Sequence, residues 1–322
     1  MKAIRYYRYG GPEVLRLEDV PTPELAPGEV LVQVRAASVN PYDWHLMRGE
    51  PRVMRLGFGL RAPRNPRLGI DVAGVVEEVG ADVTGLAVGD EVFGRGEEGS
   101  LAELTAVPAW RLVHKPESIT FEQAAAVPAA AVTALQALRD GGRIELGHKV
   151  LVNGAAGGVG TFAVQIAKSF GADVTAVAST ANLDMLAEIG ATHVIDYTAE
   201  DFTARDSRYD VVLDAIGNHP LSRCARVVAP GGTYLMVGGP AGKWQAPFGR
   251  MLALRLRSLF GRTRMVSVRA RYNVDDMRML RDLVADGVVV PVIDRTFPLS
   301  ETAEAITHLE TGHARGKVIV TV

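Results

Sequence analysis

The chain of 322 residues has 48% hydrophobic residues, a formal net charge of −2 and one cysteine. The near-neutral charge gives no reason to expect a nucleic-acid partner, and a single cysteine excludes an internal disulfide and a thiolate-rich zinc site. No apolar window reaches the roughly 18 residues of a membrane span, and the start lacks a signal-peptide core, so we expect a cytoplasmic protein without membrane insertion.

Residues 1–122 are predicted to form a mostly β, barrel-like unit. Short runs with strand character, such as "EVLVQVRAASVN" and "DVAGVVEEVG", alternate with turns that contain glycine and proline. The closing segment 289–322 holds a helix, with Ser300 as its expected cap, and then the strand-like "GKVIVTV". This last strand is expected to complete the first unit.

Residues 123–288 show a different pattern, in which apolar strands alternate with amphipathic segments. "KVLVNG" precedes the helix-like "GVGTFAVQIAKSFG", and "ADVTAVAS", "THVIDY", "YDVVLDAIGN" and "TYLMVGG" follow with further helical segments between them. Continuous apolar strands of this kind are buried on both faces by helices. We therefore predict an α/β protein whose second domain is a doubly wound parallel sheet.

The stretch "VNGAAGGVG" suggests where a cofactor binds. A strand ends, glycines at 157 and 160 stand three apart, and a helix begins, which is the setting for a dinucleotide pyrophosphate at a helix N-terminus. Ala155 replaces the first glycine of the usual fingerprint, so a simple tight turn is the alternative reading. The predicted pyrophosphate contacts are Gly154, Ala155, Ala156, Gly157, Gly158, Val159 and Gly160.

The second strand of this domain bears on the choice between NADPH and NADH. It ends in "AVASTAN", and positions 176–182 contain no acidic residue that would bind the adenosine ribose of NAD. The hydroxyls of Ser179 and Thr180 can face a 2′-phosphate without repelling it. We therefore predict NADPH, with NADH still possible. Tyr197 in "VIDY" is a candidate phosphate contact, or alternatively covers the sheet edge.

The order of motifs along the whole chain resembles the medium-chain dehydrogenase/reductase superfamily, in its zinc-independent, zeta-crystallin-like quinone oxidoreductase branch. The likeness runs from "MKAIRYYRYGGPEVLRLEDVPTPELAPGEVLVQVRAASVNPYDW" through "GAAGGVG" and "GATHVIDY" to "HARGKVIVTV". It implies a GroES-like catalytic domain, a Rossmann domain, a cofactor cleft between them and a homodimer formed through the Rossmann sheet edge. The edge strand would be "RMVSVRA".

The same resemblance implies that no catalytic zinc is bound. The positions that match the zinc ligands of the zinc-dependent members are Asn40, Ile70 and Ala129, and none is a strong zinc ligand. Without a Lewis acid, alcohol oxidation is hard, whereas a quinone or conjugated enone delocalises the charge itself. The implied reaction is hydride transfer from NADPH to a small-molecule acceptor of that kind.

Three residues of the segment "SVNPYDWH" are predicted to be catalytic. Asn40 matches the residue that donates a hydrogen bond to the acceptor oxygen, although it could instead tie a loop together. His45 is a candidate proton donor, because the pKa of histidine suits neutral pH, and a purely structural histidine is the alternative. Asp43 matches a family position, with acceptance of backbone N–H bonds as its alternative role.

Other residues are expected to line the site around the nicotinamide. Tyr42 and Trp44 are candidates for the apolar wall of the substrate pocket, with ordinary core packing as the alternative. Thr133 matches a threonine that bonds near the nicotinamide, with a hydroxyl bonded back to its own helix as the alternative. Ile216 and Gly217 follow a strand of the Rossmann domain as further cofactor contacts.

Two arginine-rich stretches, 51–70 and 243–264, contain no acidic residue. Each could be a solvated face, a field that attracts NADPH or an anionic substrate, or a site for an anionic membrane surface. Two other functions stay open beside quinone or enone reduction. One is reduction of enoyl thioesters, with the basic stretches receiving a carrier phosphate, and the other is a noncatalytic NADPH-binding regulatory protein.

Overall fold

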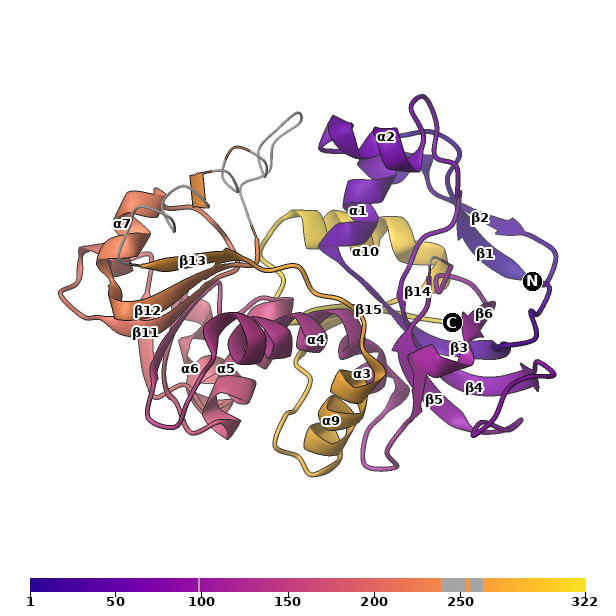
Figure 1. Cartoon of the computed structure of the whole chain (residues 1–322). Helices are drawn as coiled ribbons and strands as arrows, with labels where there is room; N and C mark the ends of the chain where they lie inside the picture. Colours follow the sequence, from indigo (N-terminus) through magenta and orange to yellow (C-terminus); the bar gives the residue numbers. More distant parts are fainter. Residues whose placement is uncertain (98, 239–248, 250–252, 255–262) are drawn as a thin grey trace. The chain divides into compact units, whose positions relative to one another are not determined.

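The computed structural model describes residues 1–97, 99–238, 249, 253–254 and 263–322 (Figure 1). The chain divides into two compact units. The first consists of residues 1–129, 272–287 and 291–322, and the second of residues 130–271 and 288–290.

The first unit is built around a seven-stranded sheet in the order β14-β15-β3-β4-β5-β7, with β6 paired to β3. Its long strand β3 alternates buried Val30, Val32 and Val34 with exposed Gln33 and Arg35, a period of two that places one face on the core. The strands of this unit are β1 (Lys2–Arg5), β2 (Arg16–Asp19), β3 (Glu29–Val39), β4 (Asp71–Val79), β5 (Glu91–Arg95), β6 (Leu104–Pro108), β7 (Leu112–His114), β14 (Ile293–Pro298) and β15 (Lys317–Thr321).

Strand β15 pairs antiparallel with β3, so the end of the chain completes the first sheet as predicted. The helices of the unit are α1 (Pro41–Arg48), α2 (Arg55–Phe58), α3 (Phe121–Ala126), α9 (Val274–Ala285) and α10 (Thr302–Glu310). Short 3-10 turns are η1 (Pro12–Val14), η2 (Arg52–Met54), η3 (Ala109–Arg111) and η7 (Leu299–Glu301).

The second unit contains a six-stranded sheet in the order β10-β9-β8-β11-β12-β13, and every pair in it is parallel. The strands are β8 (Lys149–Asn153), β9 (Asp173–Ala178), β10 (His193–Asp196), β11 (Tyr209–Asp214), β12 (Val228–Met236) and β13 (Arg264–Ser267). The strand order reverses between β8 and β11. In open sheets of this type ligands bind at the carboxyl ends of the strands at such a switch point.

Helices cover both faces of this sheet, with α5 and α6 below it and α7 above it in Figure 1. The helical segments of the second unit are α4 (Pro128–Gln136, whose first two residues belong to the first unit), the π-helical η4 (Ala137–Gly142), α5 (Gly158–Ser169), η5 (Thr180–Asn182), α6 (Leu183–Glu188), η6 (Phe202–Ala204) and α7 (Leu221–Arg226). The predicted doubly wound parallel sheet is confirmed. Strand β13, from the segment expected at the sheet edge, is its last described strand.

The structure differs from the sequence prediction at two places. The domain boundaries differ, because residues 123–129 and 272–287 group with the first unit and residues 289–290 with the second. In the first unit, α3 packs against β3 and α9 packs against β7. Ser300 does not cap the last helix, since it lies inside η7 and α10 begins only at Thr302, without a side-chain cap.

Candidate functional site

A glycine turn follows β8 at the carboxyl edge of the parallel sheet. Gly154 has a φ of 81°, a left-handed conformation that glycine adopts without strain. The next residue, Ala155, is buried, and its N–H donates to the carbonyl of Val177 in β9. The position that needs glycine is therefore Gly154, which explains why alanine is accepted at 155.

The helix that starts after this turn approaches it closely. A Cβ on Gly160 would lie 2.1 Å from the carbonyl oxygen of Gly154, so only glycine allows this approach. Gly157 is the N-cap of α5, and a Cβ there would meet nothing closer than 3.5 Å. The first N–H groups of α5, among them those of Gly158 and Val159, have no carbonyl in a preceding turn to bond. Together with the helix dipole they can receive a pyrophosphate.

A buried carboxylate shapes the neighbouring loop after β11. Asp214 accepts hydrogen bonds from the N–H groups of Ile216 at 3.1 Å and Gly217 at 2.7 Å, and from the hydroxyl of Tyr234 at 2.5 Å. Asn153 at the end of β8 also donates to Asp214, at 2.8 Å. These bonds fix the two predicted cofactor residues beside the switch point. The sequence analysis did not single out Asp214, although an acid that ends an apolar strand is a signal for it.

The predicted adenosine end of the site contains an acid that the sequence analysis missed. The hydroxyl of Thr180 donates to the carboxylate of Asp196, whose other oxygen accepts from Thr198. These hydrogen bonds hold the pKa of Asp196 below its usual value, so it is ionised. Ser179 is bonded by the side-chain amide of Asn182, and Tyr197 is 51% exposed. Asp196, the residue before Tyr197 in "VIDY", thus places a negative charge beside Thr180.

Thr133 lies in α4 and is half-buried. This residue belongs to the second unit, as the glycine turn does. Its predicted contact with the nicotinamide stays a prediction.

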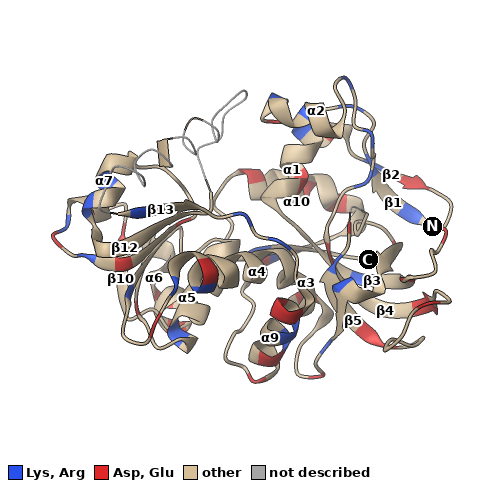
Figure 2. Ribbon diagram, viewed as in Figure 1, with Lys and Arg blue, Asp and Glu red and all other residues tan. Residues whose placement is uncertain are grey.

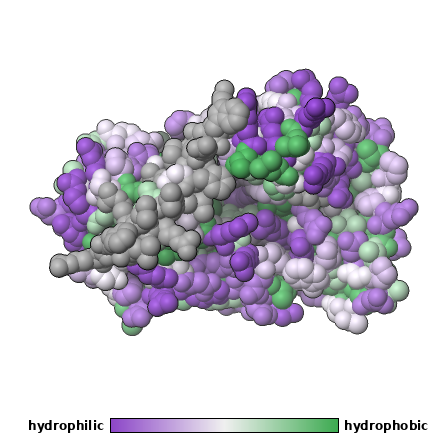
Figure 3. Space-filling view, turned by 45° about the horizontal axis from the view of Figure 1, so that its top comes forward, coloured by the Kyte–Doolittle hydropathy of each residue, from purple (hydrophilic) through white to green (hydrophobic). Residues whose placement is uncertain are grey.

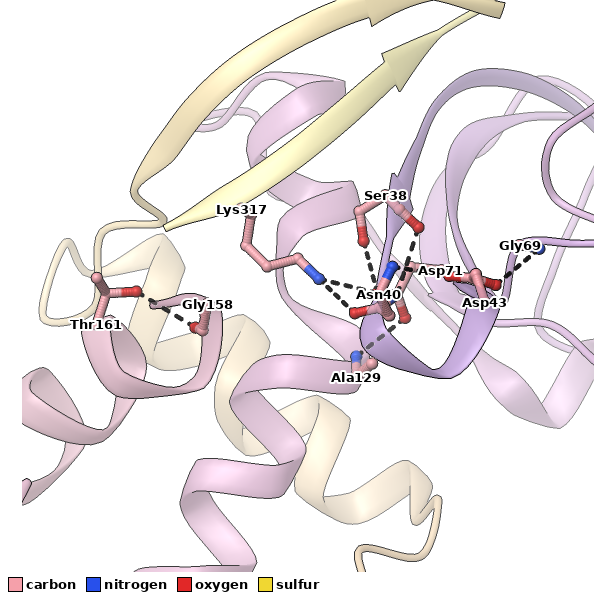
Figure 4. Close-up of polar contacts among 9 residues, drawn as sticks. All are labelled: Ser38, Asn40, Asp43, Gly69, Asp71, Ala129, Gly158, Thr161 and Lys317. Atoms are coloured by element: carbon pink, nitrogen blue, oxygen red, sulfur yellow. Dashed lines mark hydrogen bonds and ion pairs between the residues drawn. The ribbon is translucent and has the colours of Figure 1, made fainter. Parts of the chain in front are cut away.

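In the first unit, Asn40 is at the centre of a buried polar network (Figure 4). Its Nδ2 donates to Asp71 Oδ2 at 2.9 Å and to the carbonyl of Ser38 at 3.3 Å, while its Oδ1 accepts from Lys317 Nζ at 2.5 Å. Lysine can only donate and a carboxylate can only accept, so these neighbours fix the orientation of the amide. The Nδ2 group of Asn40, which was predicted to donate to a substrate oxygen, therefore already donates to Ser38 and Asp71 within the protein.

Asp71 joins several segments of the first unit. Its Oδ2 accepts from Ser38 Oγ at 2.7 Å and lies 3.6 Å from Lys317 Nζ, and its Oδ1 accepts from the N–H of Ala129 at 3.0 Å. Burial lowers the pKa of Lys317, while the charges of Asp71 and Asp43 oppose this shift. The network shown in Figure 4 thereby connects Asn40, Asp71 and Ala129. Asn40 and Ala129 are two of the positions that match zinc ligands in the zinc-dependent members, and Asp71 is next to the third, Ile70.

Asp43 is fully buried, and both of its carboxylate oxygens accept backbone hydrogen bonds. The N–H of Asn40 donates at 2.7 Å and that of Gly69 at 3.0 Å. These are the loop-holding contacts that the sequence left open as an alternative to catalysis. Burial raises the pKa of Asp43 to about 7, and the nearby charge of Asp71 adds to this.

This raised pKa predicts how stability depends on pH. An acid whose pKa is higher in the folded than in the unfolded chain stabilises the fold at low pH, and this contribution is lost as pH rises toward the folded pKa. We expect the free energy of unfolding of the native protein to fall, relative to that of Asp43→Asn, between about pH 4 and pH 7. Urea unfolding at a series of pH values measures this, and parallel profiles for the two proteins would contradict it.

His45 and Trp44 stack on each other in α1, with 3.7 Å between ring centroids. The Nδ1 of His45 lies 2.7 Å from the carbonyl oxygen of Glu50, so this nitrogen carries the proton and Nε2 carries the lone pair. Burial lowers the pKa of His45 below its usual value. Trp44 and Tyr42 both pack on the core of the first unit. Tyr42 also lines a pocket of about 400 Å³.

Of the two basic stretches, the structure describes 51–70 in full and 243–264 only in part. Most of 243–264 lies outside the described residues. In 51–70, Arg55 packs over the ring of Tyr9 at 4.3 Å and donates to the carbonyl of Gly49, so this arginine is used within the fold. Figure 3 shows hydrophobic residues gathered near α2, where the exposed apolar side chains are Val53, Leu56, Phe58 and Leu60. Figure 2 shows basic and acidic residues interspersed over both units.

The described residues contain no helix that is long and apolar enough to cross a membrane. They also contain no group of three or more His, Cys, Asp or Glu side chains that could hold a metal ion.

Models of two protein families match the chain. Residues 26–117 match the alcohol dehydrogenase GroES-like domain, and residues 189–320 match the family described as zinc-binding dehydrogenase. The chain is also 37% identical, over 336 residues, to a protein of Arabidopsis thaliana named NADPH-dependent alkenal/one oxidoreductase, chloroplastic. That alignment covers 99% of this chain and 79% of the relative.

Solved structures extend the comparison to the whole fold. The quinone oxidoreductase from Coxiella burnetii is 33% identical, with a TM-score of 0.88 and coverage of 100% of this chain and 99% of that one. The quinone oxidoreductase of Escherichia coli, solved with NADPH, is 25% identical with a TM-score of 0.86, and both chains are covered completely.

Proposed function

Because the chain belongs to the medium-chain dehydrogenase/reductase superfamily, within its quinone oxidoreductase branch, we propose that it transfers hydride from NADPH to a quinone or an α,β-unsaturated carbonyl compound. The observation that carries this proposal is the glycine turn at residues 154–160, at the switch point of the parallel sheet. The names of the relatives, an alkenal/one oxidoreductase and two quinone oxidoreductases, support the acceptor class.

The residues of the second unit fit a nicotinamide dinucleotide. The absence of a side chain at Gly157 and the N–H groups that begin α5 suit the pyrophosphate, and the loop that Asp214 holds presents Ile216 and Gly217 beside them. When bound, NADPH supplies a hydride from C4 of its nicotinamide ring.

The matching positions do not fit a catalytic zinc ion. Ile70 and Ala129 have no donor atom in their side chains, and the side-chain oxygen of Asn40 already accepts from Lys317. We therefore propose a reaction without zinc. A quinone or enone suits it, because the acceptor delocalises the charge that develops on its oxygen.

Reduction of such an acceptor consumes one hydride and one proton. We propose that His45 delivers the proton from its imidazolium form, in which Nε2 is also protonated, through a water held at Nε2, and that the ring is left neutral with its proton on Nδ1. The bond from Nδ1–H to Glu50 orients the ring for this. Asn40 is then a positioning residue, which ties α1 to Asp71 and Lys317.

Replacing His45 by phenylalanine tests this role. The aromatic ring can still stack on Trp44, but the proton path is lost, so we expect kcat to fall about 100-fold. In the native enzyme the dependence of kcat on pH should also show a group whose pKa is lowered from that of a free histidine, which the variant lacks. Replacing the exposed His114 by phenylalanine is the matched control. An unchanged pH profile in His45→Phe would show that His45 has no part in proton delivery.

We propose NADPH rather than NADH as the preferred donor, and Asp196 as the residue that limits the preference. Its negative charge beside Thr180 repels a 2′-phosphate placed there. Asp196→Asn should therefore lower KM for NADPH about fivefold and leave KM for NADH nearly unchanged. Asp206→Asn, an exposed acid of the same unit, is the control. Equal changes in both KM values would place the 2′-phosphate elsewhere.

The proposed function is tested by NADPH and NADH oxidation with purified, chelator-treated protein. The acceptors are ortho-quinones, para-quinones, alkenals and crotonyl-CoA. Turnover of quinones or alkenals supports the proposal. Turnover of crotonyl-CoA alone identifies an enoyl-thioester reductase, and NADPH binding without oxidation by any acceptor identifies a regulatory protein.

We further propose a cytoplasmic homodimer. Within the described part of the sheet, β13 has a strand neighbour on one side, β12, which leaves its other edge for a second copy. Light scattering after size-exclusion chromatography measures the mass in solution, and a monomer at micromolar concentration would refute this assembly.

A further inference from the structure

A pocket of the first unit is lined by apolar side chains and by two arginines that have no role in the proposed hydride transfer. Its volume is about 400 Å³, and its lining includes Tyr42, Ile70, Arg95, Glu97, Arg111 and Tyr272. Tyr42 and Ile70 give one side an apolar surface, while the two arginines lie at the ends of β5 and η3. A ligand that fills it must offer both an apolar body and a group that suits a guanidinium.

Arg95 and Arg111 differ in how far their guanidinium groups are satisfied, since only the Nε of Arg111 is buried without a hydrogen bond. Arg95 is half-buried, and within the described residues its guanidinium forms no hydrogen bond or ion pair. The reason lies in the sheet register, which places Arg95 opposite Asp71. Residues directly opposite in an antiparallel pair share a face, so Asp71 would be the natural partner.

Asp71 is not available to Arg95. Its two oxygens already accept from Ser38, Asn40 and the N–H of Ala129, and its charge lies 3.6 Å from the ammonium of Lys317. A carboxylate buried this completely among donors does not turn outward to a second cation. Arg95 therefore keeps its charge and its donors for a group that enters the pocket.

Arg111 and Tyr272 surround this position without neutralising it. Arg111 meets Glu97 only at 3.5 Å, and the side chain of Glu97 is 64% exposed, so this ion pair is weak in water. Tyr272 donates to the backbone carbonyl of Arg111, and burial raises the pKa of its phenol, which stays neutral. The described residues of the pocket lining thus carry two positive charges against one exposed negative charge.

We propose that this pocket selects acceptors that carry a carboxylate, with Arg95 binding the carboxylate and Tyr42 and Ile70 contacting the apolar body. A guanidinium presents two parallel N–H groups that match a carboxylate, and such paired bonds are stronger than neutral ones. This inference rests on the proposed function for its reacting group, the quinone or enone, but the carboxylate site itself is independent of turnover.

Two matched acceptors test the selectivity. One is 3-(1,4-benzoquinon-2-yl)propanoate and the other is its methyl ester, in which two methylene groups separate the changed group from the ring, so that both quinones are reduced equally readily. We expect the native enzyme to have a KM about tenfold lower for the acid than for the ester. This preference should disappear in Arg95→Gln and persist in part in Arg95→Lys. The control Arg35→Gln, on an exposed position of β3, should keep it whole.

Calorimetry with a ligand that cannot be reduced separates this inference from the proposed function. The native protein should bind 3-phenylpropanoate about tenfold more tightly than 3-phenylpropanamide, and Arg95→Gln should bind both alike. If no quinone or alkenal is reduced but this difference is found, the proposed function fails and the carboxylate site stands. Equal KM values for acid and ester, or equal binding of acid and amide by the native protein, would overturn the carboxylate site.

Discussion

Gly160→Ala should raise the dissociation constant for NADPH at least about 100-fold, equivalent to about 2.8 kcal/mol, and should destabilise the second unit by about 3 kcal/mol. The added Cβ would lie 2.1 Å from the carbonyl oxygen of Gly154 and 2.7 Å from backbone atoms of Ala155. Backbone cannot rotate away as a flexible side chain can, so α5 must move off the turn. This movement displaces the N–H groups that the pyrophosphate needs.

Gly157→Ala separates the effect on the fold from the effect on the ligand. The nearest atom to a Cβ at 157 is 3.5 Å away, an ordinary contact, and this residue has an extended backbone with a φ of −80°. The fold should therefore keep its thermal stability, while NADPH binding weakens because a methyl group occupies the open space over the turn. Fluorescence titration with NADPH and thermal unfolding of the two variants provide both readouts. Normal NADPH binding by folded Gly157→Ala would place the pyrophosphate away from this turn.

The glycine turn shows why local features could be predicted from the sequence. A strand, a turn and a helix are neighbours along the chain, so "VNGAAGGVG" contains nearly all the residues that shape the site. The sequence alone did not explain why alanine replaces the first glycine of the fingerprint at position 155. The positive φ of Gly154 explains it, because the left-handed residue comes one position earlier than the substitution.

Contacts between distant segments could not be predicted in the same way. Asp196 is the last residue of β10, the next strand along the chain after Thr180, and only the parallel pairing of β9 and β10 brings the two side chains together. Lys317 is 277 residues from Asn40. It meets Asn40 because β15 pairs with β3, and neither periodicity nor motif spacing contains that information. The hydrogen bonds that the amide of Asn40 forms with Asp71 and Lys317 are therefore a result of the fold and not of the local sequence.

Lys317→Met should have the largest effect on the first unit, with a loss of about 3–5 kcal/mol of stability. Its ammonium lies 3.6 Å from Asp71 Oδ2, and the side chains are 4% and 0% exposed. Methionine is close to lysine in length and can fill the same space, but it leaves the carboxylate of Asp71 buried without a counter-charge. It also leaves Asn40 Oδ1 without the donor it now has.

The exposed pair of Lys2 and Asp19 is the matched control, because its N–O distance is also 3.6 Å while its side chains are 53% and 79% exposed. Lys2→Met should change the midpoint of urea unfolding very little, since water screens this pair. The comparison isolates burial as the cause of the loss. If the two lysine variants lost equal stability, the buried network would not be what holds β15 to α1.

The double variant Lys317→Met with Asp71→Asn tests whether the two buried charges act together. Once both charges are removed, the amide of Asn40 can turn over, so that its oxygen accepts from the new amide at 71. The double variant should therefore lose less stability than the sum of the two single variants, with a coupling energy of about 2 kcal/mol. Additive losses would mean that Lys317 acts on the fold without its charge, through packing alone. A recovered double variant with low kcat would show that the position of Asn40, and not only stability, depends on this pair.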